Sequence, residues 1–148
     1  MTDTMTGGCQ CGRVRYAAAI ANDEAYVCHC GMCRRATGGI SIAFKQVALA
    51  DVTWTATSPD YYQSSPIARR PFCKVCGTPL GFQFLDGDAM DLTVGSFDDP
   101  TRFRPTSHFS IETALPAWMD VSHLPGTRLD EHAPVADRWK KALGKLPD

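Results

Sequence analysis

Seven cysteines in 148 residues, gathered into three tight groups, constrain this chain more than any other feature. The N-terminus, MTDTMTGG, lacks the basic and apolar regions of a signal peptide, so we expect a cytoplasmic protein. Cytosolic thiols stay reduced, and clustered ones more often bind metal than form disulfides. The three groups are a CxC (Cys9 and Cys11), a CxCxxC (Cys28, Cys30 and Cys33) and a CxxC followed by Gly77 (Cys73 and Cys76).

The first and third groups together supply four thiols. A CxxCG turn is typical of a zinc knuckle, because the tight turn directs both sulfurs inward and the glycine lets backbone N–H groups approach them. A CxC in an extended segment directs its two side chains the same way and can complete the site. We therefore predict a closed, structural zinc site on Cys9, Cys11, Cys73 and Cys76, with disulfides as the alternative. It would tie positions roughly 60 residues apart, which stabilises a small domain.

Three thiols remain: Cys28, Cys30 and Cys33. Structural zinc sites are saturated by four protein ligands, whereas catalytic sites have three and leave one position for water or substrate. Three thiolates and one Zn²⁺ carry a net charge of about −1, so the metal is a weak Lewis acid that suits a soft thiolate better than a hydroxide. The sequence therefore predicts a second, catalytic zinc whose incoming ligand is a thiol.

Cationic and imidazole side chains lie close to these thiols in the sequence. Arg34 and Arg35 follow Cys33, and Arg69 and Arg70 precede Cys73. If the fold brings the four arginines together, they form a rim that binds the carboxylates of a thiol such as glutathione; otherwise they offset thiolate charge or lie in solvent. His29 is either a fourth ligand or a packed neighbour, and His108 is a candidate acid or base.

Short segments separated by ten prolines and twelve glycines favour a mainly β, antiparallel fold. Residues 79–85 place Leu80, Phe82 and Phe84 on one face at a spacing of two, and Asp86-Gly87 predicts a hairpin into 90–94. Further strands are expected at 13–18, 41–44 and 52–57.

Two helices are expected. A short one follows Cys30 and ends at Gly38-Gly39. A C-terminal helix over about 134–144 has apolar residues at helical spacing and is interpreted as a cover for the sheet. The length fits a single domain, 1–148.

Charge and hydropathy argue against a nucleic-acid-binding protein and against a membrane-spanning one. The formal net charge is −1, which disfavours a nucleic-acid partner such as that of a zinc ribbon. No apolar run is long enough to span a membrane. An iron–sulfur electron carrier is another interpretation of the clustered cysteines. The colour of the purified protein distinguishes the two, since a zinc protein is colourless and an iron–sulfur protein is brown. The sequence leaves open whether the chain forms a homo-oligomer.

Four segments together resemble the glutathione-dependent formaldehyde-activating enzyme (GFA) family, which includes centromere-protein-V-like members. They are GGCQCGRVRY, CHCGMCRRATGG, RRPFCKVCGTPL and HFSIETALPAW, and they cover a core of about 7–125.

The resemblance implies a β-tent fold, structural zinc on the four-cysteine group and catalytic zinc on the three-cysteine group. It also implies a carbon–sulfur lyase or synthase activity, similar to S-(hydroxymethyl)glutathione synthase, with a small-molecule thiol and a small electrophile as substrates. Since one fold hosts many functions, a non-catalytic zinc-binding or chaperone-like module of the same fold is the alternative.

Overall fold

A computed structural model describes residues 2–146 of the chain, which divide into two compact units between Leu115 and Pro116. The strands are β1 (Asp3–Gly8), β2 (Arg15–Ile20), β3 (Glu24–Cys28), β4 (Ile42–Ala48), β5 (Val52–Trp54), β6 (Asp60–Ser65), β7 (Ala68–Phe72), β8 (Gly81–Phe84), β9 (Ala89–Thr93) and β10 (Arg104–Phe109). The α-helices are α1 (Gly31–Thr37) and α2 (Ala133–Leu143). Short 3₁₀ turns lie at Leu49–Asp51, Val94–Ser96, Pro100–Arg102, Ile111–Thr113 and Pro116–Trp118.

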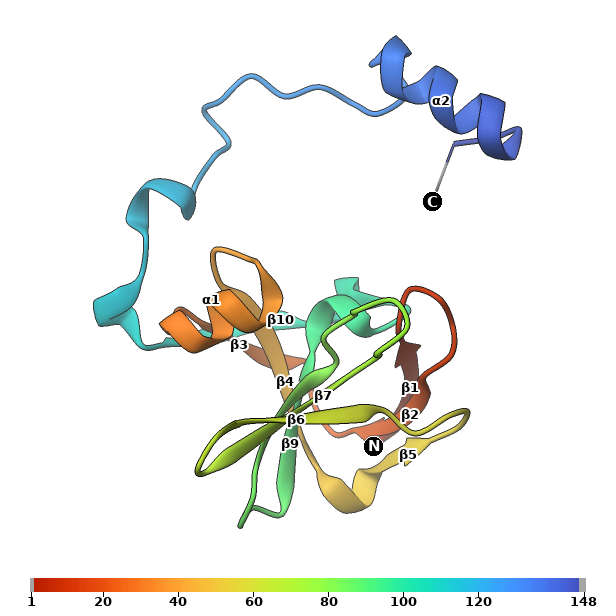
Figure 1. The fold of residues 1–148 in the computed structure, drawn as a ribbon. Coiled ribbons are helices and arrows are strands. Elements are labelled where there is room, and N and C mark those ends of the chain that lie inside the picture. The colour runs from red at the N-terminus through yellow and green to blue at the C-terminus, as the bar shows by residue number, and fades with distance from the viewer. Residues whose placement is uncertain (1, 147–148) are drawn as a thin grey trace. The chain divides into compact units, whose positions relative to one another are not determined.

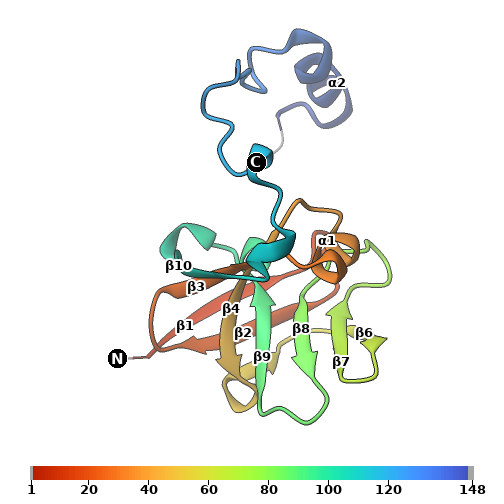
Figure 2. The ribbon, with the colours of Figure 1, turned by 90° about the vertical axis from the view of Figure 1, so that its left-hand side faces the viewer.

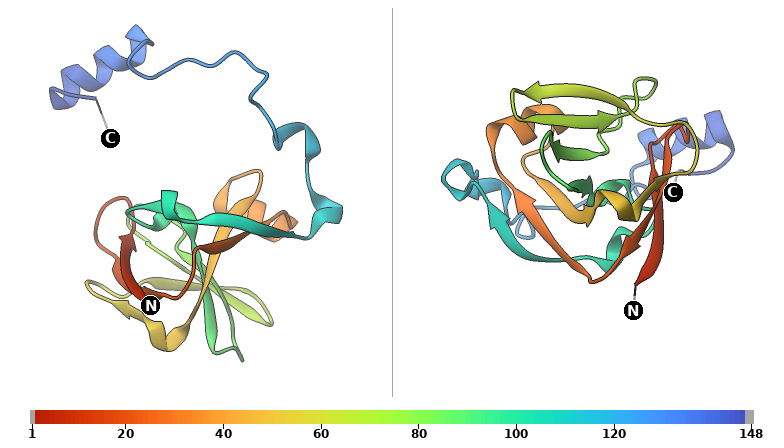
Figure 3. Two further views of the ribbon diagram at one scale, coloured as in Figure 1. Left: turned by 180° about the vertical axis from the view of Figure 1, so that it is seen from behind. Right: turned by 90° about the horizontal axis from the view of Figure 1, so that it is seen from below.

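Two sheets build the first unit (Figure 1). The smaller has the order β1-β2-β5, and the larger has the order β10-β3-β4-β9-β8-β7-β6. All of these strand pairs are antiparallel except β10 and β3, which run parallel. Figure 2 shows β4, β9, β8 and β7 side by side with α1 at one end of them. Seen from below, the strands curve around a common interior (Figure 3).

The main core fills this interior and includes the four-cysteine end of the unit. Tyr16, Ile20, Leu80 and Leu92 are fully buried there, and Cys73 packs in the same cluster. The Tyr16 hydroxyl lies 2.9 Å from the hydroxyl of Ser96, so the one polar atom of this aromatic side chain is satisfied. The core therefore depends on the same packing that brings the first and third cysteine groups together.

The mainly β architecture with two helices confirms the predicted fold class. Strands lie where 13–18, 41–44, 52–57 and 79–85 predicted them, and β8 and β9 form the hairpin expected at Asp86-Gly87. Helix α1 ends at Gly38, whose φ of 72° only glycine adopts easily. One detail differs: Leu80 is buried, but Phe82 is only half-buried and Phe84 is exposed, so this apolar face does not continue into the main core.

The second unit contains α2, which agrees with the helix predicted over about 134–144. Within α2, Ala136 is the buried side chain, while Trp139 and Leu143 are exposed. The proposed cover for the sheet and the single domain over 1–148 both stay predictions. In the part of the chain that the structure describes, neither helix has the length and apolar character needed to cross a bilayer.

Candidate metal centres

Two loops with the same local design hold the four-cysteine group, which comprises Cys9, Cys11, Cys73 and Cys76. In the β7–β8 loop, Gly77 has a φ of +77° and its N–H donates to the carbonyl of Cys73 at 2.7 Å. In the β1–β2 loop, Gly12 has a φ of +79° and its N–H donates to the carbonyl of Cys9 at 3.0 Å. Glycine tolerates this left-handed backbone, so each chain turns sharply and directs its sulfurs inward.

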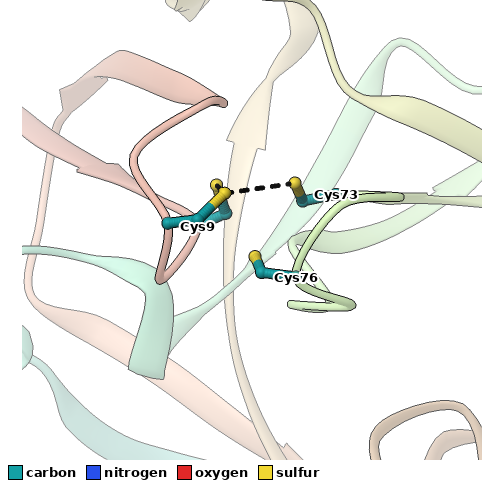
Figure 4. Close-up of side chains that lie close together, drawn as sticks. Cys9, Cys73 and Cys76 are labelled. Carbon is teal, nitrogen blue, oxygen red and sulfur yellow. Dashed lines mark hydrogen bonds between the residues drawn. The ribbon is translucent and has the colours of Figure 1, made fainter.

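The sulfurs of the four-cysteine group lie within 4.8 Å of one another. The Sγ atoms of Cys9 and Cys11 are 3.6 Å apart, and those of Cys11 and Cys73 are 3.8 Å apart. Figure 4 shows Cys9, Cys73 and Cys76 directed toward one another. A tetrahedral ion with Zn–S bonds of about 2.3 Å places its ligand sulfurs about 3.8 Å apart. The group fits such an ion, and the cysteines are free thiols rather than disulfides.

Hydrogen bonds prepare part of this group to carry negative charge. The Thr78 side chain and backbone lower the pKa of Cys76 to about 5. The amide of Val14 donates to the Cys9 sulfur at 3.2 Å. Arg13 lies 4.0 Å from the Cys73 sulfur while it pairs with Asp60 at 2.8 Å. Because a cation binds thiolates rather than thiols, these donors favour the metal-bound state.

The Gly77 turn gives a first testable prediction. Gly77→Ala places a Cβ in open space but keeps a φ of +77°, so we expect a loss of about 1 kcal/mol in the free energy of unfolding. Gly95→Ala is the matched control, since its Cβ also meets no atom within 4 Å and its φ is not left-handed. Urea unfolding of both zinc-loaded variants measures the difference, and equal stabilities would refute the role given to the turn.

The second group, Cys28, Cys30 and Cys33, lies where β3 passes into α1. Cys30 caps the helix, and its sulfur accepts a hydrogen bond from the amide of Cys33 at 3.3 Å. The three sulfurs lie within 4.8 Å of one another, and no other His, Cys, Asp or Glu among residues 2–146 joins them. Burial raises the pKa of Cys33 to about 12, although Arg70 opposes this shift. Three soft donors with this spacing fit a thiophilic ion such as zinc and leave one ligand position unfilled by these residues.

The four predicted arginines do not form one rim. Arg70 is buried, and its guanidinium donates to the Cys33 sulfur at 3.5 Å. Arg69 is the next residue along β7, so it points to the other side, where it stacks on Tyr61 and bonds to Gln83. Arg34 donates to the backbone carbonyls of His29 and Thr113, and Arg35 lines a neighbouring hollow of about 540 Å³ that Arg70 also borders.

The two histidines near the three-cysteine group pair with each other. His29 is buried, and its Nε2 lies 3.2 Å from Nδ1 of His108. Of the two roles considered for His29, a fourth ligand or a packed neighbour of the cysteines, its position fits the packed neighbour. His108 lies on β10, opposite Val27 of β3, and lines the cleft described next.

A largely apolar cleft of about 760 Å³ opens beside the three-cysteine group. Phe44 packs directly on Cys28 and Cys33, with Tyr26 and Phe82 beside it. Asp91, on β9, is the buried acidic residue of the lining. This cleft was not predicted from the sequence, although a single aspartate between Met90 and Leu92 was a usable signal.

A profile of the glutathione-dependent formaldehyde-activating enzyme family matches residues 4–113. The chain is 33% identical over 81 residues to a Schizosaccharomyces pombe protein named uncharacterized lyase C29B12.13, and the match spans 55% of this chain and 58% of that protein. A crystal structure of a Rhodobacter sphaeroides protein is similar with a TM-score of 0.58 at 24% identity, covering 71% of this chain and 100% of that one. This last likeness concerns the fold alone.

The mainly β scaffold gathers seven thiols into groups of four and three, each of which could hold a metal ion. The family match covers most of the chain, so this protein belongs to the glutathione-dependent formaldehyde-activating enzyme family, as the resemblance indicated. The roles of individual cysteines as ligands stay predictions, now supported by their spacing.

Proposed function

We propose that this protein is a zinc-dependent carbon–sulfur lyase or synthase. It joins a thiol, glutathione or a similar one, to formaldehyde or another small electrophile, or it catalyses the reverse reaction. The observation that carries this proposal is the group of three thiols at the edge of a 760 Å³ cleft, without a fourth acidic, histidine or cysteine ligand among the described residues. The family name supports the reaction type, and the yeast relative is named a lyase.

Zinc on Cys28, Cys30 and Cys33 would supply a vacant position that holds an incoming thiol as its thiolate. In the synthetic direction a carbon–sulfur bond forms while the carbonyl π bond breaks, and the proton of the thiol ends on the former carbonyl oxygen. The chain holds the two reactants side by side in the cleft, which removes much of the entropic barrier of a bimolecular addition.

Arg70 is the chain's main electrostatic contribution at this place. One guanidinium N–H faces the Cys33 sulfur and offsets the negative charge of the thiolates. The Nε–H of Arg70 is buried and has no hydrogen-bond partner among the described residues. We assign this N–H to an oxygen of the substrate, either a carboxylate of the thiol or the oxygen that gains charge as sulfur attacks.

The test is turnover by the zinc-loaded protein with a panel of thiols and aldehydes. We expect at least one pair to form its adduct about 10²-fold faster than the same pair in buffer. NMR signals of the carbon that becomes bonded to sulfur measure the rate. Free zinc salt at the same concentration is the control. Turnover no faster than this control across the panel would exclude the enzyme and favour the non-catalytic module.

A further inference from the structure

The lining of the cleft is poorly matched to formaldehyde as the main binding partner. Phe44 and Phe82 form its floor beside the cysteines, and the exposed rings of Phe84 and Phe109 extend the apolar wall. A volume of 760 Å³ lies within the usual range for drug-sized ligands and far exceeds a one-carbon aldehyde. Exposed aromatic side chains cost free energy in water, and an apolar ligand that covers them recovers it.

Two buried side-chain polar atoms lack a hydrogen-bond partner within residues 2–146, and both belong to residues that line this cleft. They are Nε of Arg70 and Oδ1 of Asp91. Asp91 is only 6% exposed, so water satisfies its free oxygen poorly. The side chains of Tyr26 and Gln46 lie beside this carboxyl group, but neither forms a hydrogen bond with Oδ1. A buried polar atom without a partner is costly, and such atoms are rare in folded proteins, so each one points to a missing partner such as a ligand.

Strand register places Asp91 at the opposite end of the cleft from the cysteines. On β4, Ile42 pairs with Cys28, and Gln46 pairs with Asp91 of β9. Four residues along a strand correspond to about 13 Å. The cysteine and aspartate side chains cover part of this separation, so a ligand that joins the two ends spans on the order of 10 Å. Phe44 lies midway between them on the same face.

We infer that the substrate is a thiol, or its adduct, that carries an apolar group of about the size of an aromatic ring and, at its far end, a hydrogen-bond donor. Oδ1 of Asp91 accepts the hydrogen bond from this donor. This inference rests on the proposed function, because it needs sulfur at the three-cysteine group. The apolar group would lie over Phe44 and beside Phe82, whose ring also has the Arg70 guanidinium 5.0 Å from its centroid. A carboxyl oxygen accepts a hydrogen bond in either protonation state, so a hydroxyl, amine or amide at the far end meets the requirement.

Four probe thiols separate the parts of this inference. 4-(Sulfanylmethyl)benzyl alcohol has the ring and the donor, (4-methylphenyl)methanethiol has the ring alone, 2-mercaptoethanol has neither, and glutathione is anionic. Calorimetric titration of the zinc-loaded protein gives each dissociation constant. We expect the ring alone to bind at least about tenfold tighter than 2-mercaptoethanol, and the ring with the donor to bind tightest. Absorbance of the cobalt-substituted protein reports separately whether each sulfur reaches the metal.

Asp91→Leu removes the acceptor while keeping a buried side chain of similar size. We expect it to weaken the benzyl alcohol probe about tenfold and to leave the methyl probe unchanged, a contrast that a purely structural role would not produce. Leu85→Ala, an exposed apolar position that follows Phe84 and does not line the cleft, should change neither probe. Equal losses for both probes in the Asp91 variant would overturn the role of Asp91.

The outcomes also distinguish the two proposals. If thiols change the cobalt spectrum but 2-mercaptoethanol or glutathione binds as tightly as the aromatic probes, the inferred substrate class is wrong and the proposed function stands. If no thiol changes the spectrum, sulfur does not reach the metal, and both proposals fall.

Discussion

Replacing Cys30 with serine is expected to remove one of two zinc ions and to abolish thiol-dependent turnover while the fold persists. Cys30 lies at the surface end of its group, where it caps α1 and packs beside the small cluster of Cys28, Cys33 and Phe44 rather than in the main core. A serine oxygen still caps a helix well but is a poor zinc ligand. We expect turnover to fall by at least about 10²-fold, while the free energy of unfolding falls by about 1–2 kcal/mol.

Metal analysis, circular dichroism and the turnover assay together check this expectation. Met32→Leu is the matched control, because Met32 is an exposed residue of the same helix whose replacement keeps all three thiols. It should keep two zinc ions per chain and a similar melting temperature. If Cys30→Ser instead unfolds the protein, the division of the seven cysteines into a structural four and a catalytic three is wrong.

The cysteine groups were predictable from sequence because each is set by a short turn. A CxxC followed by Gly77 can form only a few compact turns, and the separation of Cys28, Cys30 and Cys33 is fixed by one strand end and one helical turn. The family match over residues 4–113 includes all three of these cysteine groups. Because a closed zinc site takes four ligands, the seven cysteines could be divided into four and three without any knowledge of the tertiary fold.

The cleft and its polar end were not predictable, because they depend on the register of several strands. Arg70 reaches Cys33 only because β7 lies beside β8 and faces α1, and Asp91 lies opposite Gln46 only through the pairing of β9 with β4. The sequence could, however, have shown that Arg69 and Arg70 do not share one rim. Arg69 and Arg70 are neighbours on one strand, so period-two geometry already places their side chains on opposite faces. Phe82 and Phe84 follow the predicted period but line a cleft rather than the main core.

Replacing Cys73 with serine is expected to have the largest effect on stability. Cys73 is fully buried in the main core cluster, and its sulfur is 3.8 Å from that of Cys11, 62 positions away in the sequence. The four-cysteine group joins the β1–β2 loop to the β7–β8 loop. Its ion would hold together segments that are otherwise joined by packing and by a hydrogen bond from the amide of Gln10 to the hydroxyl of Thr78 at 3.1 Å. Structural zinc binding contributes about 10–16 kcal/mol to folding in small domains, which exceeds the total stability of most domains.

We therefore expect Cys73→Ser to be unfolded at 25 °C, a loss of at least about 5 kcal/mol, with both zinc ions absent. Circular dichroism, urea unfolding and zinc content measure this, and Cys30→Ser serves as the control that also loses one thiol and one ion. Chelation should reproduce the result in the unmodified chain, since the four sulfurs left without the metal either repel one another as thiolates or take up protons, and in both cases the bonds that joined the two loops are lost. A folded Cys73→Ser protein that keeps one zinc ion would show that packing and hydrogen bonds join the two loops without the metal. In that case the four-cysteine group would not be the element that stabilises the scaffold of the three-cysteine site.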